Sequence, residues 1–142
     1  MLFPVFYVLI VITILMFLCM PFVEIRLGFV FRANKLEYGK IVKRIDEEIK
    51  NGKIVLDGNL SCTSLPPTEE YHLISIHSIW LCSSRDGHGY FIRFTEAGTF
   101  SYDAGHIYVS PDCEISTCVP YYEIFRPVAP NWYFYKWDTI AG

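Results

Sequence analysis

Hydrophobic and polar positions divide the chain into stretches of different periodicity, and the first stretch has no polar face. Residues 1–23 contain no charged side chain, and the first charge is Glu24. A helix of this run is roughly 35 Å long, and a bilayer's hydrocarbon core is about 30 Å thick. We therefore predict a transmembrane anchor over residues 1–23 and a juxtamembrane linker over residues 24–33. The linker is either an interfacial continuation of the helix or extended.

Two alternatives to an anchor are a buried core helix and a cleaved signal peptide. A domain of this size rarely buries a helix that is apolar on all sides. A signal peptide usually has a basic start and small residues at its cleavage site, and this run has neither. Both observations favour a retained anchor.

From residue 34 to 50, apolar positions recur at spacings of three and four. This pattern predicts an amphipathic helix with one apolar stripe. Asn34 and Glu37 have the spacing of a capping box at its start, and Gly52 suits its end. The stripe is expected to pack against a sheet and consists of Leu36, Tyr38, Ile41, Val42, Ile45 and Ile49.

Beyond Gly52 the period changes to two, which is typical of half-buried strands. Strands are predicted at 53–58, 72–82, 90–94, 99–102, 106–110, 121–125 and 131–137. Turns or loops are predicted between them at 83–89, 95–98, 103–105 and 126–130. The predicted fold is α+β: an N-terminal transmembrane helix, then one amphipathic helix packed on an antiparallel β-meander of five to seven short strands. Residues 34–142 form the globular domain.

Charge is distributed unevenly along the chain. Eight of the 12 Lys and Arg residues fall between Arg26 and Lys53, whereas residues 54–142 are acidic overall. A basic segment beside a membrane attracts anionic head groups, and the acidic remainder argues against nucleic acid as a partner. Because basic residues flank only the distal end of the anchor, the positive-inside rule would place the domain in the cytoplasm.

Cysteine usage predicts the opposite side. Four cysteines follow the anchor, an even number that fits two disulfides in an oxidising compartment. The pairings Cys62–Cys82 and Cys113–Cys118 are favoured because each brackets a predicted loop or turn. Four free thiols are the alternative, and the spacings lack the paired knuckles of a zinc site. We predict the domain to be extracytoplasmic, in the periplasm, with the anchor in the inner membrane.

Motifs for catalysis, phosphate binding and metal binding are missing from the sequence. The histidines His88 and His106 could meet across neighbouring hairpins and pair with Asp86 or Asp103. That arrangement would make the protein a small hydrolase-like enzyme. We predict instead that it is not an enzyme and needs no cofactor or metal.

Aromatic residues are concentrated near the C-terminus. A two-faced strand must turn about half of them away from the core, and exposed Tyr and Trp beside Arg are typical of protein-binding surfaces. The predicted partner-binding residues are Tyr121, Tyr122, Trp132, Tyr133, Tyr135, Trp137 and Arg126. The alternatives are an aromatic belt at the membrane interface and a small core that needs large side chains.

Together these patterns predict a single-pass membrane protein whose extracytoplasmic domain binds another protein. One version is an immunity-type inhibitor of a toxin, and another is an accessory subunit of an envelope or pilus assembly.

Overall fold

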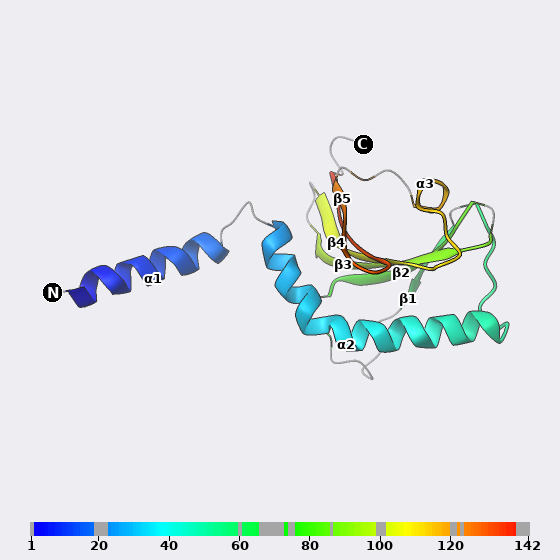
Figure 1. Ribbon diagram of the computed structural model, residues 1–142, viewed down its shortest axis with the longest axis horizontal. Helices are drawn as coiled ribbons and strands as arrows, with labels where there is room; N and C mark the ends of the chain where they lie inside the picture. Colours follow the sequence, from blue (N-terminus) through cyan, green and yellow to red (C-terminus); the bar gives the residue numbers. More distant parts are fainter. Residues whose placement is uncertain are drawn as a thin grey trace.

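The computed structural model describes residues 2–18, 23–59, 61–65, 73, 76–85, 87–98, 102–119, 122 and 124–138. The protein is α+β, with two long helices, a one-turn helix and a six-stranded antiparallel sheet within these residues (Figure 1). The helices are α1 (Leu2–Leu18), α2 (Val23–Lys50) and α3 (Ile115–Cys118). The strands are β1 (Cys62–Leu65), β2 (Ser78–Ser83), β3 (Tyr90–Gly98), β4 (Tyr102–Val109), β5 (Ile124–Ala129) and β6 (Trp132–Asp138).

Helix α1 extends away from the rest of the molecule (Figure 1). Its side chains from residue 2 to residue 16 are all exposed, including Leu2 and Phe3. Among the helices in the described part of the chain, none has the combination of length and apolarity needed to cross a membrane. The structure therefore contains the predicted N-terminal helix but does not show it to be transmembrane.

Helix α2 begins at Val23, eleven residues before the predicted start. Residues 24–33, predicted as a linker, are therefore helical, and Asn34 is a buried residue inside the helix instead of its cap. The reason is that Leu27 and Phe31, both buried, extend the apolar stripe by two turns toward the N-terminus. Within the stripe, Leu36 alone points outward, with 74% of its surface exposed.

The sheet has the strand order β1-β2-β3-β4-β6-β5, with every neighbouring pair antiparallel. Strands β1 to β4 pair in sequence order, as in the predicted meander, but β1 lies outside the predicted strands. The last two strands depart from a meander, because β6 pairs with β4 and β5 lies at the edge. The loop predicted at 126–130 largely belongs to β5. An edge strand tolerates Pro127, which has no N–H to donate.

Three other predicted boundaries are wrong. Residues 95–98 are part of β3 instead of a turn, with a bulge between Thr95 and Ala97. Residues 103–105 lie inside β4, where Gly105 is needed because a Cβ would collide with the carbonyl oxygen of Phe94. Residues 53–58 form no strand, because Ile54 and Leu56 pack on the core from an irregular segment. The turn between β2 and β3 is present, with Gly87 at φ +74°.

One face of the sheet packs against α2. Its core joins Phe31, Tyr38, Ile41 and Ile45 of the helix to side chains of the sheet. The sheet contributes Ile79, Leu81, Tyr90, Ile92, Phe94 and Trp132. The predicted packing of the amphipathic helix on a sheet is therefore confirmed.

The opposite face is concave, because the strands bend away from α2 and α3 lies above one end of them (Figure 1). A second core lies on this face and includes Phe91, Ile107, Val109, Tyr135 and Cys118. In β2, the alternation follows the prediction: Ile79 and Leu81 face α2, and Trp80 and Cys82 face the concave side.

Candidate functional site: the concave aromatic face

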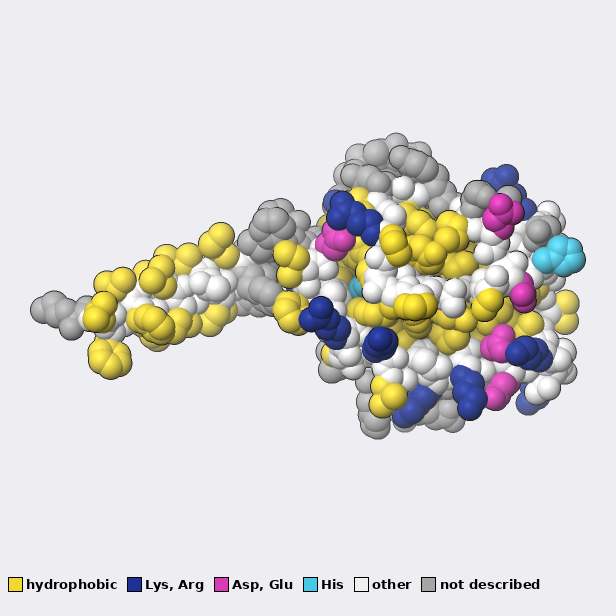
Figure 2. Space-filling view, in the orientation of Figure 1, with side chains coloured by type: hydrophobic (Ala, Val, Ile, Leu, Met, Phe, Trp, Pro, Cys, Tyr) yellow, Lys and Arg dark blue, Asp and Glu magenta, His cyan; other side chains and the backbone are white. Residues whose placement is uncertain are grey.

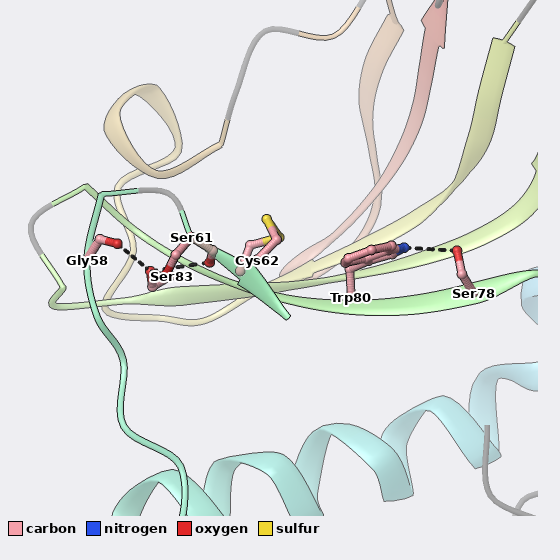
Figure 3. Close-up of a disulfide and its surroundings, with 7 residues drawn as sticks. Gly58, Ser61, Cys62, Ser78, Trp80 and Ser83 are labelled. Carbon is pink, nitrogen blue, oxygen red and sulfur yellow. Dashed lines mark hydrogen bonds between the residues drawn. A yellow bond between two sulfur atoms is a disulfide. The ribbon is translucent and has the colours of Figure 1, made fainter. Parts of the chain in front are cut away.

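Both predicted disulfides are present. Cys62 and Cys82 lie directly opposite each other in β1 and β2, and their disulfide is on the side of the sheet away from α2 (Figure 3). Cys113 and Cys118 bracket the start and end of α3. Gly89 allows this second loop to approach the sheet, because a Cβ there would collide with Cys113. Each disulfide thus anchors one part of the rim of the concave face.

Hydrogen bonds fix the surroundings of the first disulfide. The hydroxyl of Ser83 donates to the carbonyl oxygen of Gly58 over 3.0 Å and lies 3.1 Å from the hydroxyl of Ser61 (Figure 3). Further along β2, the indole Nε1 of Trp80 donates to the Ser78 hydroxyl over 3.0 Å. The Trp80 ring is therefore held in place on the concave side.

We define the aromatic face as the ring-bearing side chains of the concave side together with Arg93. Its members are Trp80, Phe91, Arg93, Tyr122, Phe125, Tyr133 and Tyr135. Phe125 stacks on Tyr133 with 4.6 Å between ring centroids, and Tyr122 lies 5.0 Å from Tyr135. The Arg93 guanidinium lies 5.8 Å from the Trp80 ring centroid, within reach of a cation–π interaction. Figure 2 shows hydrophobic side chains gathered on this side of the head, above the sheet.

Two buried polar atoms of the aromatic face have no hydrogen-bond partner among the described residues. They are Nε of Arg93 and the hydroxyl of Tyr122. Burial raises the pKa of Tyr122, and the nearby Arg93 guanidinium opposes part of that rise. By contrast, the hydroxyl of Tyr135 is satisfied by the Thr95 hydroxyl 2.8 Å away. Arg93 and Tyr122 are therefore polar neighbours inside a core that is otherwise mostly apolar.

The predicted partner-binding residues differ in how far their side chains are exposed. Tyr122 and Tyr135 are buried in the concave core, and Trp132 is buried on the opposite side, against α2. Tyr133 is half-buried, and Trp137 is 39% exposed on the same strand. Three of the predicted partner-binding rings thus belong to the core, as the interpretation of the cluster as core packing predicts.

Two predicted partner-binding residues remain. Arg126 is exposed on β5, where its guanidinium donates to the Glu24 carboxylate of α2 over 3.1 Å. Tyr121 lies outside the described residues.

His106, one of the two histidines on which the alternative enzyme hypothesis depends, is buried beneath α2. Its Nδ1 lies 2.8 Å and 2.9 Å from the two carboxylate oxygens of Glu96, and its ring stacks on Phe31. The Tyr38 hydroxyl donates to the same carboxylate over 2.7 Å. Burial raises the pKa of Tyr38, and Glu96 raises it further, while a hydrogen bond from Asn34 partly offsets these effects. We call His106, Glu96, Tyr38 and Asn34 the buried polar cluster.

The structure does not bring His88 and His106 together. His88 is exposed in the turn before Tyr90, whereas His106 lies inside the sheet opposite Phe94 on the α2 side. Asp103 lies near the start of β4, opposite Gly98 of β3 and Trp137 of β6 in the strand register. Asp86 lies outside the described residues. The described residues also contain no group of three or more His, Cys, Asp or Glu positioned to hold a metal ion.

Sequence reasoning missed Glu96 and Arg93, the charged residues at the centre of the two faces. Glu96 was placed in a turn, although the β-bulge brings it into the interior. A glycine inside a strand pattern often marks a bulge or a close backbone approach, so Gly105 was the signal that could have identified it. Arg93 lies in an otherwise apolar strand, Tyr90–Phe94, and its isolation there was the signal for a special role.

Comparisons of the chain with protein-family models, with curated proteins and with solved structures find no match. The function is therefore inferred from the geometry of the two faces of the sheet.

Proposed function

We propose that this protein is a membrane-anchored, non-enzymatic module that binds another protein through its aromatic face on the extracytoplasmic side. The observation that carries the proposal is the aromatic face, on which Trp80, Phe125 and Tyr133 remain partly exposed beside Arg93. A partner that lies on these rings would bury them further and place a polar group near the Arg93 guanidinium.

The composition of the aromatic face supports a protein as the partner. Aromatic residues and Arg are enriched in the centres of protein interfaces, where a few of them contribute most of the binding energy. Tyr133 of the aromatic face is partly exposed, and Trp137, further along the same strand, is 39% exposed. An immunity-type inhibitor, which holds a toxin by one preformed surface, is the version we favour.

The membrane anchor is supported by the first residues of the chain. Residues 1–23 are uncharged, and the described side chains of α1 from 2 to 16 are exposed and mostly apolar. A contiguous apolar surface of this kind is unfavourable in water and favourable in a bilayer. We therefore propose that residues 1–23 hold the chain in the inner membrane.

The two disulfides support the extracytoplasmic side. Disulfides persist in oxidising compartments such as the periplasm and are rare in the cytosol. This consideration opposes the positive-inside rule, which depends on the same basic residues that follow the anchor. We propose that the disulfides decide the orientation.

The proposal is tested by affinity capture with the full chain from detergent-solubilised membranes, comparing Arg93→Met with Arg85→Met. Arg93 lies in the aromatic face, whereas Arg85 is exposed in the β2–β3 turn. We expect the unaltered chain to retain one stoichiometric protein, and Arg93→Met to weaken its binding about tenfold or more. Arg85→Met should bind normally. Absence of a stoichiometric protein, or equal binding by both variants, would contradict the proposal.

A further inference from the structure

The outer surface of α2, opposite the sheet, has a composition unlike the rest of the molecule. Six residues line one shallow surface there: Arg32, Lys35, Leu36, Gly39, Lys40 and Lys43. We call this surface the basic patch. Figure 2 shows Lys and Arg side chains along this edge of the head, on the side where α1 joins it.

Positive charge is concentrated in the part of α2 nearer to α1. Residues 32–43 contain four bases and a single acid, Glu37, which binds Lys40 over 3.0 Å. After residue 43 the charges balance locally, because Arg44 pairs with Glu48 and Lys50 pairs with Asp46. A helix that needed charge only for solubility would not require this segregation.

An exposed apolar side chain lies among these bases. Leu36 is 74% exposed although it belongs to a helix whose other face is well packed. Gly39, one turn later, has no atom within 4 Å of its Cβ position, so the surface beside Leu36 is open. Closer to α1, Ile25 and Phe29 are also more than half exposed, at 56% and 54%.

Basic side chains around exposed apolar groups are the composition of helices that lie in the membrane interface. The bases attract anionic head groups within a Debye length of the surface, and the apolar groups enter the acyl boundary. A protein partner for the basic patch would need its own acidic surface, whereas the bilayer is already brought close by α1.

We propose that the basic patch docks on the surface of an anionic phospholipid bilayer. This inference rests on the proposed function in one respect, because the α1 anchor holds α2 beside that bilayer. Helix α2 then lies between the bilayer and the sheet. The aromatic face, on the other side of the sheet, points away from the lipid toward its protein partner.

The test uses a nitroxide spin label at Leu36→Cys in the full chain, with Cys19→Ser to leave one reactive thiol. Power-saturation EPR measures collisions with oxygen, which enters lipid, and with a water-soluble nickel chelate. The chain is reconstituted into nanodiscs of phosphatidylcholine alone or with phosphatidylglycerol. The matched control is the label at Val55→Cys, another apolar side chain, 78% exposed and outside the basic patch.

In phosphatidylglycerol nanodiscs we expect collisions of the Leu36 label with the chelate to fall about threefold relative to phosphatidylcholine, while collisions with oxygen rise. The Val55 label should change little. Lys35→Glu should remove most of the change at Leu36, whereas Lys53→Glu, an equal charge reversal outside the basic patch, should preserve it.

Three results would overturn the inference. The first is a Leu36 label equally accessible to the chelate in both lipids. The second is protection from both reagents, which indicates contact with protein. The third is a chain that does not incorporate into either nanodisc, which would also contradict the anchor. In the first two cases the proposed anchor and aromatic face still stand, so the two proposals can be judged separately.

Discussion

The two faces of the sheet are held together by different means. On the α2 side a long helix covers the sheet, and the buried carboxylate of Glu96 is bound by both His106 and Tyr38. On the concave side the disulfides replace a covering helix, and Arg93 Nε and Tyr122 OH lack partners in the described structure. The comparison indicates that the buried polar groups on the α2 side bind one another, whereas two buried polar atoms on the concave side have no partner among the described residues.

The largest expected effect comes from removing the carboxylate of Glu96 at the centre of the α2 side. Glu96→Ala leaves His106 and the Tyr38 hydroxyl buried without their shared acceptor. We expect the free energy of unfolding to fall by about 3–5 kcal/mol, as when one member of a buried pair is removed. Urea unfolding followed by tryptophan fluorescence measures the change.

Glu47→Ala, at an exposed position of α2, is the control and should stay within about 0.5 kcal/mol of the unaltered protein. An equally small effect of Glu96→Ala would show that the buried polar cluster contributes little to stability.

Replacing each disulfide measures how much it stabilises the protein. The sequence separation is 20 residues for Cys62–Cys82 and 5 for Cys113–Cys118. Because a longer closed loop removes more entropy from the unfolded chain, replacing the first pair by Ala should cost about 3 kcal/mol and the second about 2 kcal/mol. Urea unfolding of the two double variants gives both values. A larger loss from the shorter loop would indicate that packing against Gly89, and not loop closure, dominates.

The smallest expected effect is the difference in stability between two Tyr→Phe substitutions, one on each face of the sheet. Tyr38→Phe removes a hydroxyl that donates to Glu96, so it should destabilise the protein by about 1–3 kcal/mol. Tyr122→Phe removes a buried hydroxyl without a partner among the described residues, so it should be neutral or stabilising. Thermal unfolding of the two variants checks the difference. An equal loss of stability in both variants would contradict the difference proposed between the two faces.

Local patterns predicted the elements whose two sides differ strongly in polarity. The stripe of Tyr38, Ile41 and Ile45 identified α2 and its packing face, and alternation placed Ile79 and Trp80 on opposite sides of β2. Cysteine spacing likewise identified both disulfides. In these cases the residue's own neighbours in sequence determine which side it occupies.

Features that depend on distant residues were not predictable in this way. The position of Glu96 inside the sheet depends on Gly105 and His106 of the next strand and on Tyr38 of α2. The order of β5 and β6 depends on which of them pairs with β4, and single-strand patterns contain no such information. The segregation of buried from exposed aromatic rings near the C-terminus depends on the same pairing.

The two edge strands of the sheet also limit self-association of the protein. A free strand edge is a template on which further chains can add and polymerise. At one end β1 is only four residues long and is tied to β2 by Cys62–Cys82, and at the other β5 contains Pro127, which interrupts any row of donors. Neighbouring copies of the chain can therefore lie side by side without joining their sheets edge to edge.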